Sequence, residues 1–165
     1  MRPATLRTER LILRRARPDD LDALHAILSD AEAMRYWSTP PHADRATTRE
    51  WLEGMIAAPP ETSDDFILER EGALIGKLGA WRLPEVGYIL GRDHWGHGYA
   101  LEALTAFAAY ALAKRTDHLT ADVDPRNTGS LKLLARAGFH ETHRAARTWC
   151  VAGEWCDSVY LRLDR

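Results

Sequence analysis

The stretch GRDHWGHGYALEAL, residues 91–104, carries two glycines one residue apart, Gly96 and Gly98, where an apolar-periodic run begins. It follows the apolar segment VGYIL, residues 86–90, which is typical of a buried strand. Glycine loses more conformational entropy on folding than other residues, so its use at the entrance to a helix needs a reason. A strand, a glycine-rich turn and a helix together can bind an anion, because free N–H groups at a helix start favour negative charge.

This turn predicts main-chain contacts to a phosphate. Glycine lets the backbone approach a phosphate without a Cβ between them. The amides would come from Gly96, His97, Gly98, Tyr99 and Ala100. The segment fits neither the dinucleotide-binding nor the P-loop glycine pattern, which disfavours a nucleotide-phosphate protein. Taken alone, the two glycines fit a close packing point between helix and strand equally well.

Composition places the chain among ordinary globular proteins. Its 165 residues fit one domain over residues 1–165, with 45% apolar and 28% charged residues. The net charge of -2 gives no basic surface for nucleic acid, and no apolar run approaches a membrane span. The start of the chain has charges where a signal peptide would need an apolar core, so we expect a cytoplasmic protein.

Hydrophobic periodicity predicts an α/β domain with a mixed sheet. Strands are predicted at residues 10–15, 65–70, 73–83, 85–90, 118–123, 139–145 and 157–163. Helices are predicted to begin at Pro18, near Asp44 and at Ala100, and a short one is predicted over residues 131–139, with Gly138 at its end. The helix near Asp44 is expected to turn four residues inward: Trp51, Leu52, Met55 and Ile56. Turns are expected at Glu71-Gly72 and within VAGEW, residues 151–155. Cys150 and Cys156 could face each other across the second turn, but free thiols are the expectation in a reducing compartment.

Several motifs together resemble the GNAT superfamily of acetyl-CoA-dependent N-acetyltransferases. They are WGHGYALEA after EVGYIL, DPRNTGSLKLLARAGF about thirty residues later, the opening TERLILRRARPDDLDAL and the ending GEWCDSVYLRL. The closest similarity is to the RimJ/RimL-like branch, in which tryptophan is common at the position of Trp95. The resemblance covers nearly the whole chain. It implies a central mixed, mostly antiparallel sheet flanked by helices and splayed between the strands at 86–90 and 118–123.

The resemblance also implies where acetyl-CoA binds. WGHGYA, residues 95–100, would hold the pyrophosphate through main-chain amides. Free backbone groups near Ile89 and Leu90 would pair with the pantetheine arm, and one amide would hold the thioester carbonyl. A donor aimed at a developing oxyanion can contribute about 3 kcal/mol. The expected partners are acetyl-CoA and an amine acceptor, with no metal; whether two copies form a homodimer stays open.

Ser130 is the candidate proton donor to the leaving thiolate. Asn127 and Ser130 match an N-x-x-S motif of the family, in whose RimJ/RimL-like branch the serine is thought to lie near the CoA sulfur. Many members use a tyrosine further along this helix, and SLKLLARAGF contains none. The alternative is that Ser130 or Asn127 only caps the helix. Asn127 itself is expected to contact CoA or to fix the loop.

Glu85 is the best candidate base, because it begins the strand that would carry the thioester. A solvent-exposed charge at the strand edge is an equal alternative, and a chain of waters is a third. Glu102, one turn into the next helix, is a weaker candidate. His94 and His97 lack a third metal ligand and are expected to be exposed, with His97 near the phosphates.

The acceptor pocket is expected to use aromatic residues from three segments. These are Tyr36 and Trp37 in the first long loop, Trp81, and the hairpin TWCVAGEW. Core or rim packing is the competing explanation for most of these tryptophans. Asp157 resembles a family position near this end of the pocket, and a structural role is one interpretation of it. The acceptor would be a protein N-terminus or a small-molecule amine. The main alternative function is a non-catalytic acyl-CoA-binding or regulatory module.

Overall fold

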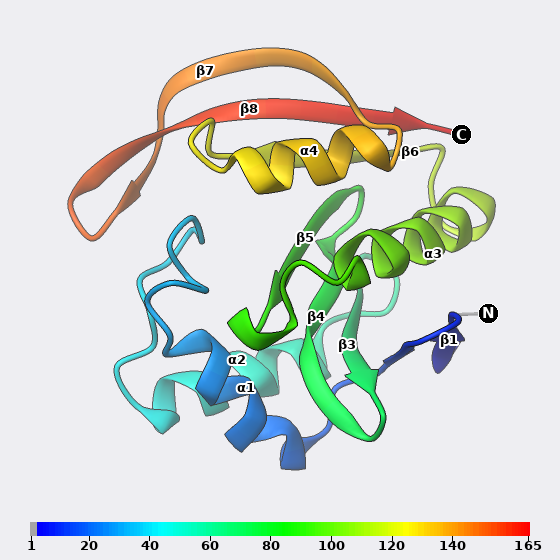
Figure 1. Cartoon of the computed structure of the whole chain (residues 1–165), viewed down its shortest axis with the longest axis vertical. Coiled ribbons are helices and arrows are strands. Elements are labelled where there is room, and N and C mark those ends of the chain that lie inside the picture. Colours follow the sequence, from blue (N-terminus) through cyan, green and yellow to red (C-terminus); the bar gives the residue numbers. More distant parts are fainter. Residues whose placement is uncertain (1–2) are drawn as a thin grey trace.

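The computed structural model of the protein describes residues 3–165 and contains one eight-stranded sheet in the order β1-β2-β3-β4-β5-β6-β8-β7 (Figure 1). The strands are β1 (Thr5–Arg7), β2 (Ile12–Arg14), β3 (Asp64–Arg70), β4 (Ala73–Arg82), β5 (Glu85–Leu90), β6 (His118–Val123), β7 (His140–Val151) and β8 (Glu154–Asp164). All neighbouring strands are antiparallel except β5 and β6, which are parallel. The predicted mixed, mostly antiparallel sheet is confirmed.

Helices cover both faces of this sheet. They are α1 (Leu21–Leu28), α2 (Arg45–Ala57), α3 (Tyr99–Lys114) and α4 (Thr128–Arg136). The larger core cluster joins α3 and α4 to the sheet, and the smaller one joins α1 and α2 to it (Figure 1). Within residues 3–165, none of the helices is both long and apolar enough to cross a membrane.

Local sequence signals set most of the turns. Asp44 caps α2 by accepting the backbone N–H of Thr47 at 2.8 Å. The two-residue turn Glu71-Gly72 has φ of 52° and 81°, and the turn Ala152-Gly153 has φ of 49° and 84°, as tight hairpins require. Gly138 follows α4 with φ of 97°, the left-handed conformation that ends many helices. These predicted turns are confirmed.

Other predicted boundaries were wrong. The strand expected over residues 10–15 is reduced to β2. A strand that was not predicted, β1, comes before it and pairs with it as a short antiparallel ribbon. The helix expected from Leu131 already begins at Thr128, since Asn127 caps it. Ile56 was expected to face inward but is 44% exposed, because Leu52 and Met55 form the buried side of α2. The closing strands β7 and β8 are also longer than predicted.

The register of β7 and β8 keeps the two cysteines apart. Trp149 lies opposite Cys156, and Cys150 lies opposite Trp155. Since side chains alternate between the faces of a sheet, Cys150 and Cys156 point to opposite faces of the hairpin. Both are free cysteines, as expected.

Candidate active site

The glycine loop between β5 and α3 has the backbone conformation that its sequence demands. Gly96 and Gly98 both lie in the left-handed region, with φ of 76° and 82°. A side chain with a Cβ is strained there, which explains both glycines. Gly98 is the N-cap of α3, and no side chain of the described residues caps this helix. The amides of its first turn are therefore available to a ligand.

The sheet opens beside this loop, because β5 and β6 separate soon after they meet. Glu85 pairs with Thr120, whose backbone N–H donates to the carbonyl of Pro84 at 3.0 Å. Within residues 3–165 no other residue pair joins these two strands. This confirms the predicted splay between residues 86–90 and 118–123. A cavity of about 610 Å³, which we call the donor cavity, lies here between β5, the glycine loop and α4.

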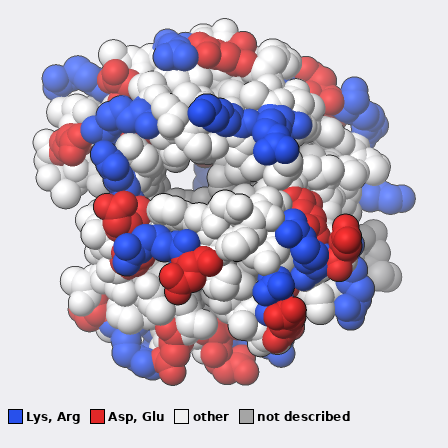
Figure 2. Space-filling model, in the orientation of Figure 1, with Lys and Arg blue, Asp and Glu red and all other residues white. Residues whose placement is uncertain are grey.

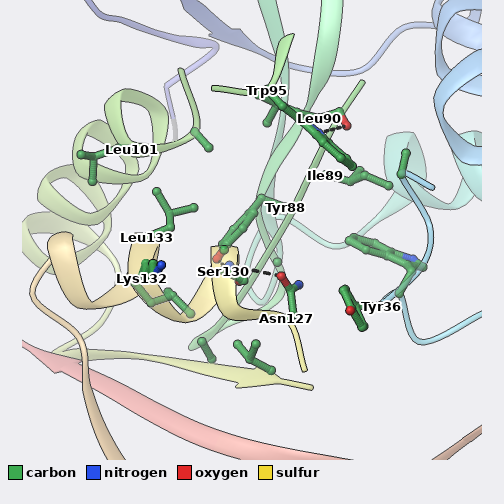
Figure 3. A pocket seen from close by; sticks show the side chains of 18 of the residues that line it. Tyr36, Tyr88, Ile89, Leu90, Trp95, Leu101, Asn127, Ser130, Lys132 and Leu133 are labelled. Carbon is green, nitrogen blue, oxygen red and sulfur yellow. Dashed lines mark hydrogen bonds between the residues drawn. The ribbon is translucent and has the colours of Figure 1, made fainter. Parts of the chain in front are cut away.

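Trp95 closes one end of the open strand edge. Its indole N–H donates to the carbonyl of Leu90 at 3.0 Å, as Figure 3 shows. On the other side of β5, the N–H of Gly91 donates to the carbonyl of Ile75 at 2.9 Å. Trp95 thus satisfies the last carbonyl of β5 and lines the donor cavity.

The direction of these bonds fixes which backbone groups of β5 are available. The carbonyls of Pro84 and Leu90 both bond on the side of the opening, toward Thr120 and Trp95. Backbone groups of alternate residues in a strand share an edge. Those of Val86 and Tyr88 therefore share this edge; Val86 adjoins the pairing of Glu85 with Thr120, so Tyr88 is the residue whose backbone faces the opening. The backbone of Ile89 faces β4 instead, although Ile89 lines the cavity.

Ser130 lies in the first turn of α4, with its side chain at the donor cavity (Figure 3). Its backbone N–H is accepted by the side-chain oxygen of Asn127 at 3.2 Å, so Asn127 is the cap of the helix. The Ser130 hydroxyl is hydrogen-bonded to the phenol of Tyr88. Burial raises the pKa of Tyr88 to about 12, an effect that the bond to Ser130 only partly offsets. Tyr88 is therefore a neutral phenol at physiological pH.

Two basic residues of α4 add positive charge to the donor cavity. Lys132 and Arg136 are four residues apart, on one side of the helix, and both line the cavity. Figure 2 shows Lys and Arg side chains along the upper edge of a central hollow on this face. Together with the amides at the start of α3, these cations favour a ligand that carries phosphate groups.

A second cavity of about 1120 Å³, the acceptor cavity, lies on the other side of the opening. The predicted residues Tyr36, Trp37, Trp81 and Glu85 line it, together with Trp149 of the predicted hairpin. Trp51, expected on the inner face of its helix, packs against the smaller core cluster and lines this cavity as well. The residues that line both cavities are Arg35, Tyr36, Trp37, Val86, Gly87, Asp122 and Asp124. The two cavities therefore meet where β5 leaves β6.

Two carboxylates, those of Glu85 and Asp122, lie near the place where the two cavities meet. Glu85 is exposed as a residue, yet partial burial of its carboxyl group raises its pKa, and the charge of Asp122 raises it further. Asp122 accepts the indole N–H of Trp149 at 2.9 Å. A carboxylate with a raised pKa, beside a second one at a cavity, can take a proton from an ammonium group.

Asp157 also lines the acceptor cavity but has a structural partner. It accepts the backbone N–H of Arg147 at 2.9 Å. Arg147 has a φ of 54°, a rare conformation for a residue with a side chain, at an irregular point in the pairing of β7 and β8. Asp157 thus stabilises the irregular part of β7.

Glu102 and His97 belong to a contact that ties the N-terminal segment to the glycine loop. Glu102 accepts the hydroxyl of Thr8 at 2.7 Å and the Arg10 guanidinium at 2.7 Å, and Arg10 also donates to the His97 carbonyl at 2.9 Å. Burial raises the pKa of Glu102, but these hydrogen bonds outweigh it and lower the pKa overall. His94 lines the donor cavity, whereas the His97 side chain is exposed.

Comparison with known proteins agrees with this geometry. The family described as "Acetyltransferase (GNAT) domain" matches residues 10–140. The chain belongs to the GNAT acetyltransferases. Among the relatives of this acetyltransferase is "Uncharacterized N-acetyltransferase p20" of Bacillus licheniformis, 32% identical over 83% of each chain.

One further relative fits the RimJ/RimL-like branch, and one solved structure fits the fold. The "[Ribosomal protein uS5]-alanine N-acetyltransferase" of Escherichia coli is 35% identical over 52% of this acetyltransferase and 44% of its own length. The crystal structure of spermidine N-acetyltransferase from Vibrio cholerae, in complex with CoA and spermine, has a TM-score of 0.80. It is 20% identical and covers 94% of this chain and 95% of its own, so this likeness shows the shared fold.

Four residues at the cavities did not stand out in the sequence. Tyr88 lies between Val86 and Leu90 in an apolar strand, where an aromatic residue suggests packing. Asp122 sits in the alternating strand HLTADV, and its polar side chain could have signalled an accessible face. The spacing of Lys132 and Arg136 indicates one side of a helix, but only the fold turns that side toward a cavity.

Proposed function

We propose that this acetyltransferase, as one domain over residues 1–165, moves the acetyl group of acetyl-CoA to a primary amine by direct attack. The observation that carries the proposal is the meeting of two chemically different cavities at Val86 and Gly87. The donor cavity combines main-chain amides and cations, and the acceptor cavity combines tryptophans and carboxylates. A cationic amine could reach a thioester only where the two cavities join.

On the donor side, the chain would hold acetyl-CoA largely through its backbone. The amides of residues 96–100 would bind the pyrophosphate, with Lys132 and Arg136 adding charge. The backbone of Tyr88 faces the opening beyond the pairing of Glu85 with Thr120, and it would bind the pantetheine arm and the thioester carbonyl. Trp95 would form one end of this site, where its indole N–H bonds the carbonyl of Leu90.

On the acceptor side, Glu85 would take the proton that makes the amine nucleophilic. Its raised pKa lies closer to physiological pH than that of an ordinary glutamate, which suits a general base. Tyr36, Trp37 and Trp81 would enclose the rest of the acceptor, since aromatic faces attract cations. Ser130 would supply a hydrogen to the sulfur as CoA leaves.

The acceptor class has two candidates, a protein N-terminus and a small-molecule amine. The E. coli relative is named for an alanine of a ribosomal protein, and the Vibrio cholerae structure holds spermine. Both chemistries present a primary amine and fit a cavity lined by Asp122 and Glu85.

Release of the CoA thiol from acetyl-CoA, in the presence of peptides with free N-termini and of polyamines, tests the proposal. Sustained turnover with any amine supports acetyl transfer. Tight binding of acetyl-CoA without turnover on either class would instead favour a non-catalytic acyl-CoA-binding module.

A further inference from the structure

Two hydroxyl groups meet inside the donor cavity although their residues are far apart in the sequence. Tyr88 belongs to β5 and Ser130 to α4, 42 residues later, and their side-chain oxygens share a hydrogen bond. Both residues line the cavity, and Figure 3 shows the phenol directed at Ser130. Within residues 3–165, neither side-chain oxygen makes another hydrogen bond.

The two hydroxyl groups carry more hydrogens than their mutual bond uses. Each hydroxyl group carries one hydrogen and can accept through its lone pairs. The mutual bond uses one of the two hydrogens, whichever group donates. A phenol is a stronger donor than an aliphatic alcohol, which favours donation from Tyr88 to Ser130. The hydrogen of Ser130 then lacks an acceptor among the described residues and is left for a molecule in the cavity.

The pair is held in place from both sides. The Tyr88 ring packs against the larger core, and its pKa of about 12 keeps the phenol protonated over the physiological range. Asn127 caps α4, so the hydroxyl of Ser130 is not needed for the helix. The spare hydrogen is therefore a fixed feature of the cavity wall.

We propose that Tyr88 is a positioning residue for the acyl transfer, which orients the Ser130 hydroxyl toward the sulfur of CoA. This inference rests on the proposed function. As the N–C bond forms and the C–S bond breaks, the sulfur keeps the electron pair and takes the proton of Ser130. Glu85 takes the first proton, from the ammonium group before attack; water takes up the second proton, which the nitrogen loses after the N–C bond forms, and returns a proton to the serine oxygen. Tyr88 keeps its own proton throughout.

The direct test is the pKa of the CoA thiol when CoA is bound, followed through the ultraviolet absorbance of the thiolate. A hydrogen bond to the thiolate favours the charged form and lowers this pKa, by roughly one unit for a charge-assisted bond. We expect the pKa to be lowered in the wild type. Ser130→Ala should abolish the shift, and Tyr88→Phe should remove much of it while keeping the ring.

A double variant separates positioning from packing. Because Tyr88 acts through Ser130, the combined variant Tyr88→Phe/Ser130→Ala should match Ser130→Ala alone in both the thiol pKa and kcat. Tyr88→Phe alone should lower kcat about tenfold or more, up to the roughly 10²-fold or larger loss expected when the acid itself is removed, and leave the Kd for acetyl-CoA within about twofold. Tyr160→Phe, which removes a phenol outside both cavities, is the matched control.

The outcomes distinguish this inference from the proposed function. If Ser130→Ala raises the thiol pKa and Tyr88→Phe does not, Tyr88 has no positioning role and the proposed function stands. Independent, additive effects of the two substitutions would also overturn it. If wild-type protein fails to bind CoA, the proposed function and this inference both fall. Should Tyr88→Phe not fold, an unchanged thiol pKa in Ser130→Ala would still refute the inference.

Discussion

The backbone N–H of Thr120 donates to the carbonyl of Pro84 at 3.0 Å, and this contact marks the point where the sheet opens. Before it, the chain reverses from β4 into β5. After it, Val86 and Gly87 line both cavities. A single contact between parallel strands thus determines where an acyl donor and an acceptor could meet, and the following predictions test the residues around that point.

Gly98→Ala should weaken acetyl-CoA binding at least tenfold. The substitution places a Cβ on a residue with φ of 82°, which costs about 1–2 kcal/mol or shifts the loop and its amides. Gly72→Ala is a matched control, because Gly72 has φ of 81° in a hairpin turn outside both cavities. Calorimetry should show a similar loss of stability in both variants and a loss of affinity in Gly98→Ala alone. Equal affinities would contradict the assignment of the loop.

Glu85→Gln should lower kcat/KM about 10²–10⁴-fold if Glu85 is the base. A base must be deprotonated to act, so the rate of the wild type should fall as pH drops through the pKa of Glu85. Because that pKa is raised, the fall should begin at a higher pH than for an ordinary glutamate. The pH profile of kcat/KM measures this. Glu53→Gln, on the exposed side of α2, is the control, and a profile unchanged in Glu85→Gln would leave water as the proton carrier.

Asp122→Asn should move the acidic limb of the same profile to lower pH. The charge of Asp122 raises the pKa of Glu85, and the substitution removes that charge. Asparagine keeps an oxygen that can accept the indole N–H of Trp149, so this contact should survive. A comparison of pH profiles for wild type and Asp122→Asn tests the coupling. A limb that stays in place would show that burial alone sets the pKa of Glu85.

Asn127→Ala and Ser130→Ala should affect different properties, the first stability and the second the rate of transfer. Loss of the cap in Asn127→Ala should lower the free energy of unfolding by about 1 kcal/mol. Ser130→Ala leaves the cap intact and should instead lower kcat about 10²-fold or more. Urea unfolding and steady-state kinetics on both variants measure the two effects. Normal kcat in Ser130→Ala would refute the role of its hydroxyl in transfer.

Local signals predicted much of the fold because they act over a few residues. Asp44 caps its helix, Glu71-Gly72 closes a hairpin and Gly138 ends α4, each through backbone geometry set by neighbouring residues. The short strand β1 was missed, since three residues carry little periodicity and β1 is held by pairing with β2. Ile56 shows the same limit, because the choice of buried face in α2 depends on the helix α1 and the small core cluster against which it packs.

The sequence by itself determined the order of the main elements, the glycine loop and the candidate residues Glu85, Asn127 and Ser130. Glycine at two left-handed positions and an asparagine at a helix start meet local requirements of the backbone, so the sequence alone indicates them. Only the tertiary structure decided that Asn127 is the cap, that Tyr88 pairs with Ser130, and that Asp122 acts on Glu85. Those relationships join residues from different strands and helices. They depend on where β5 and β6 separate, which is a property of the packed sheet.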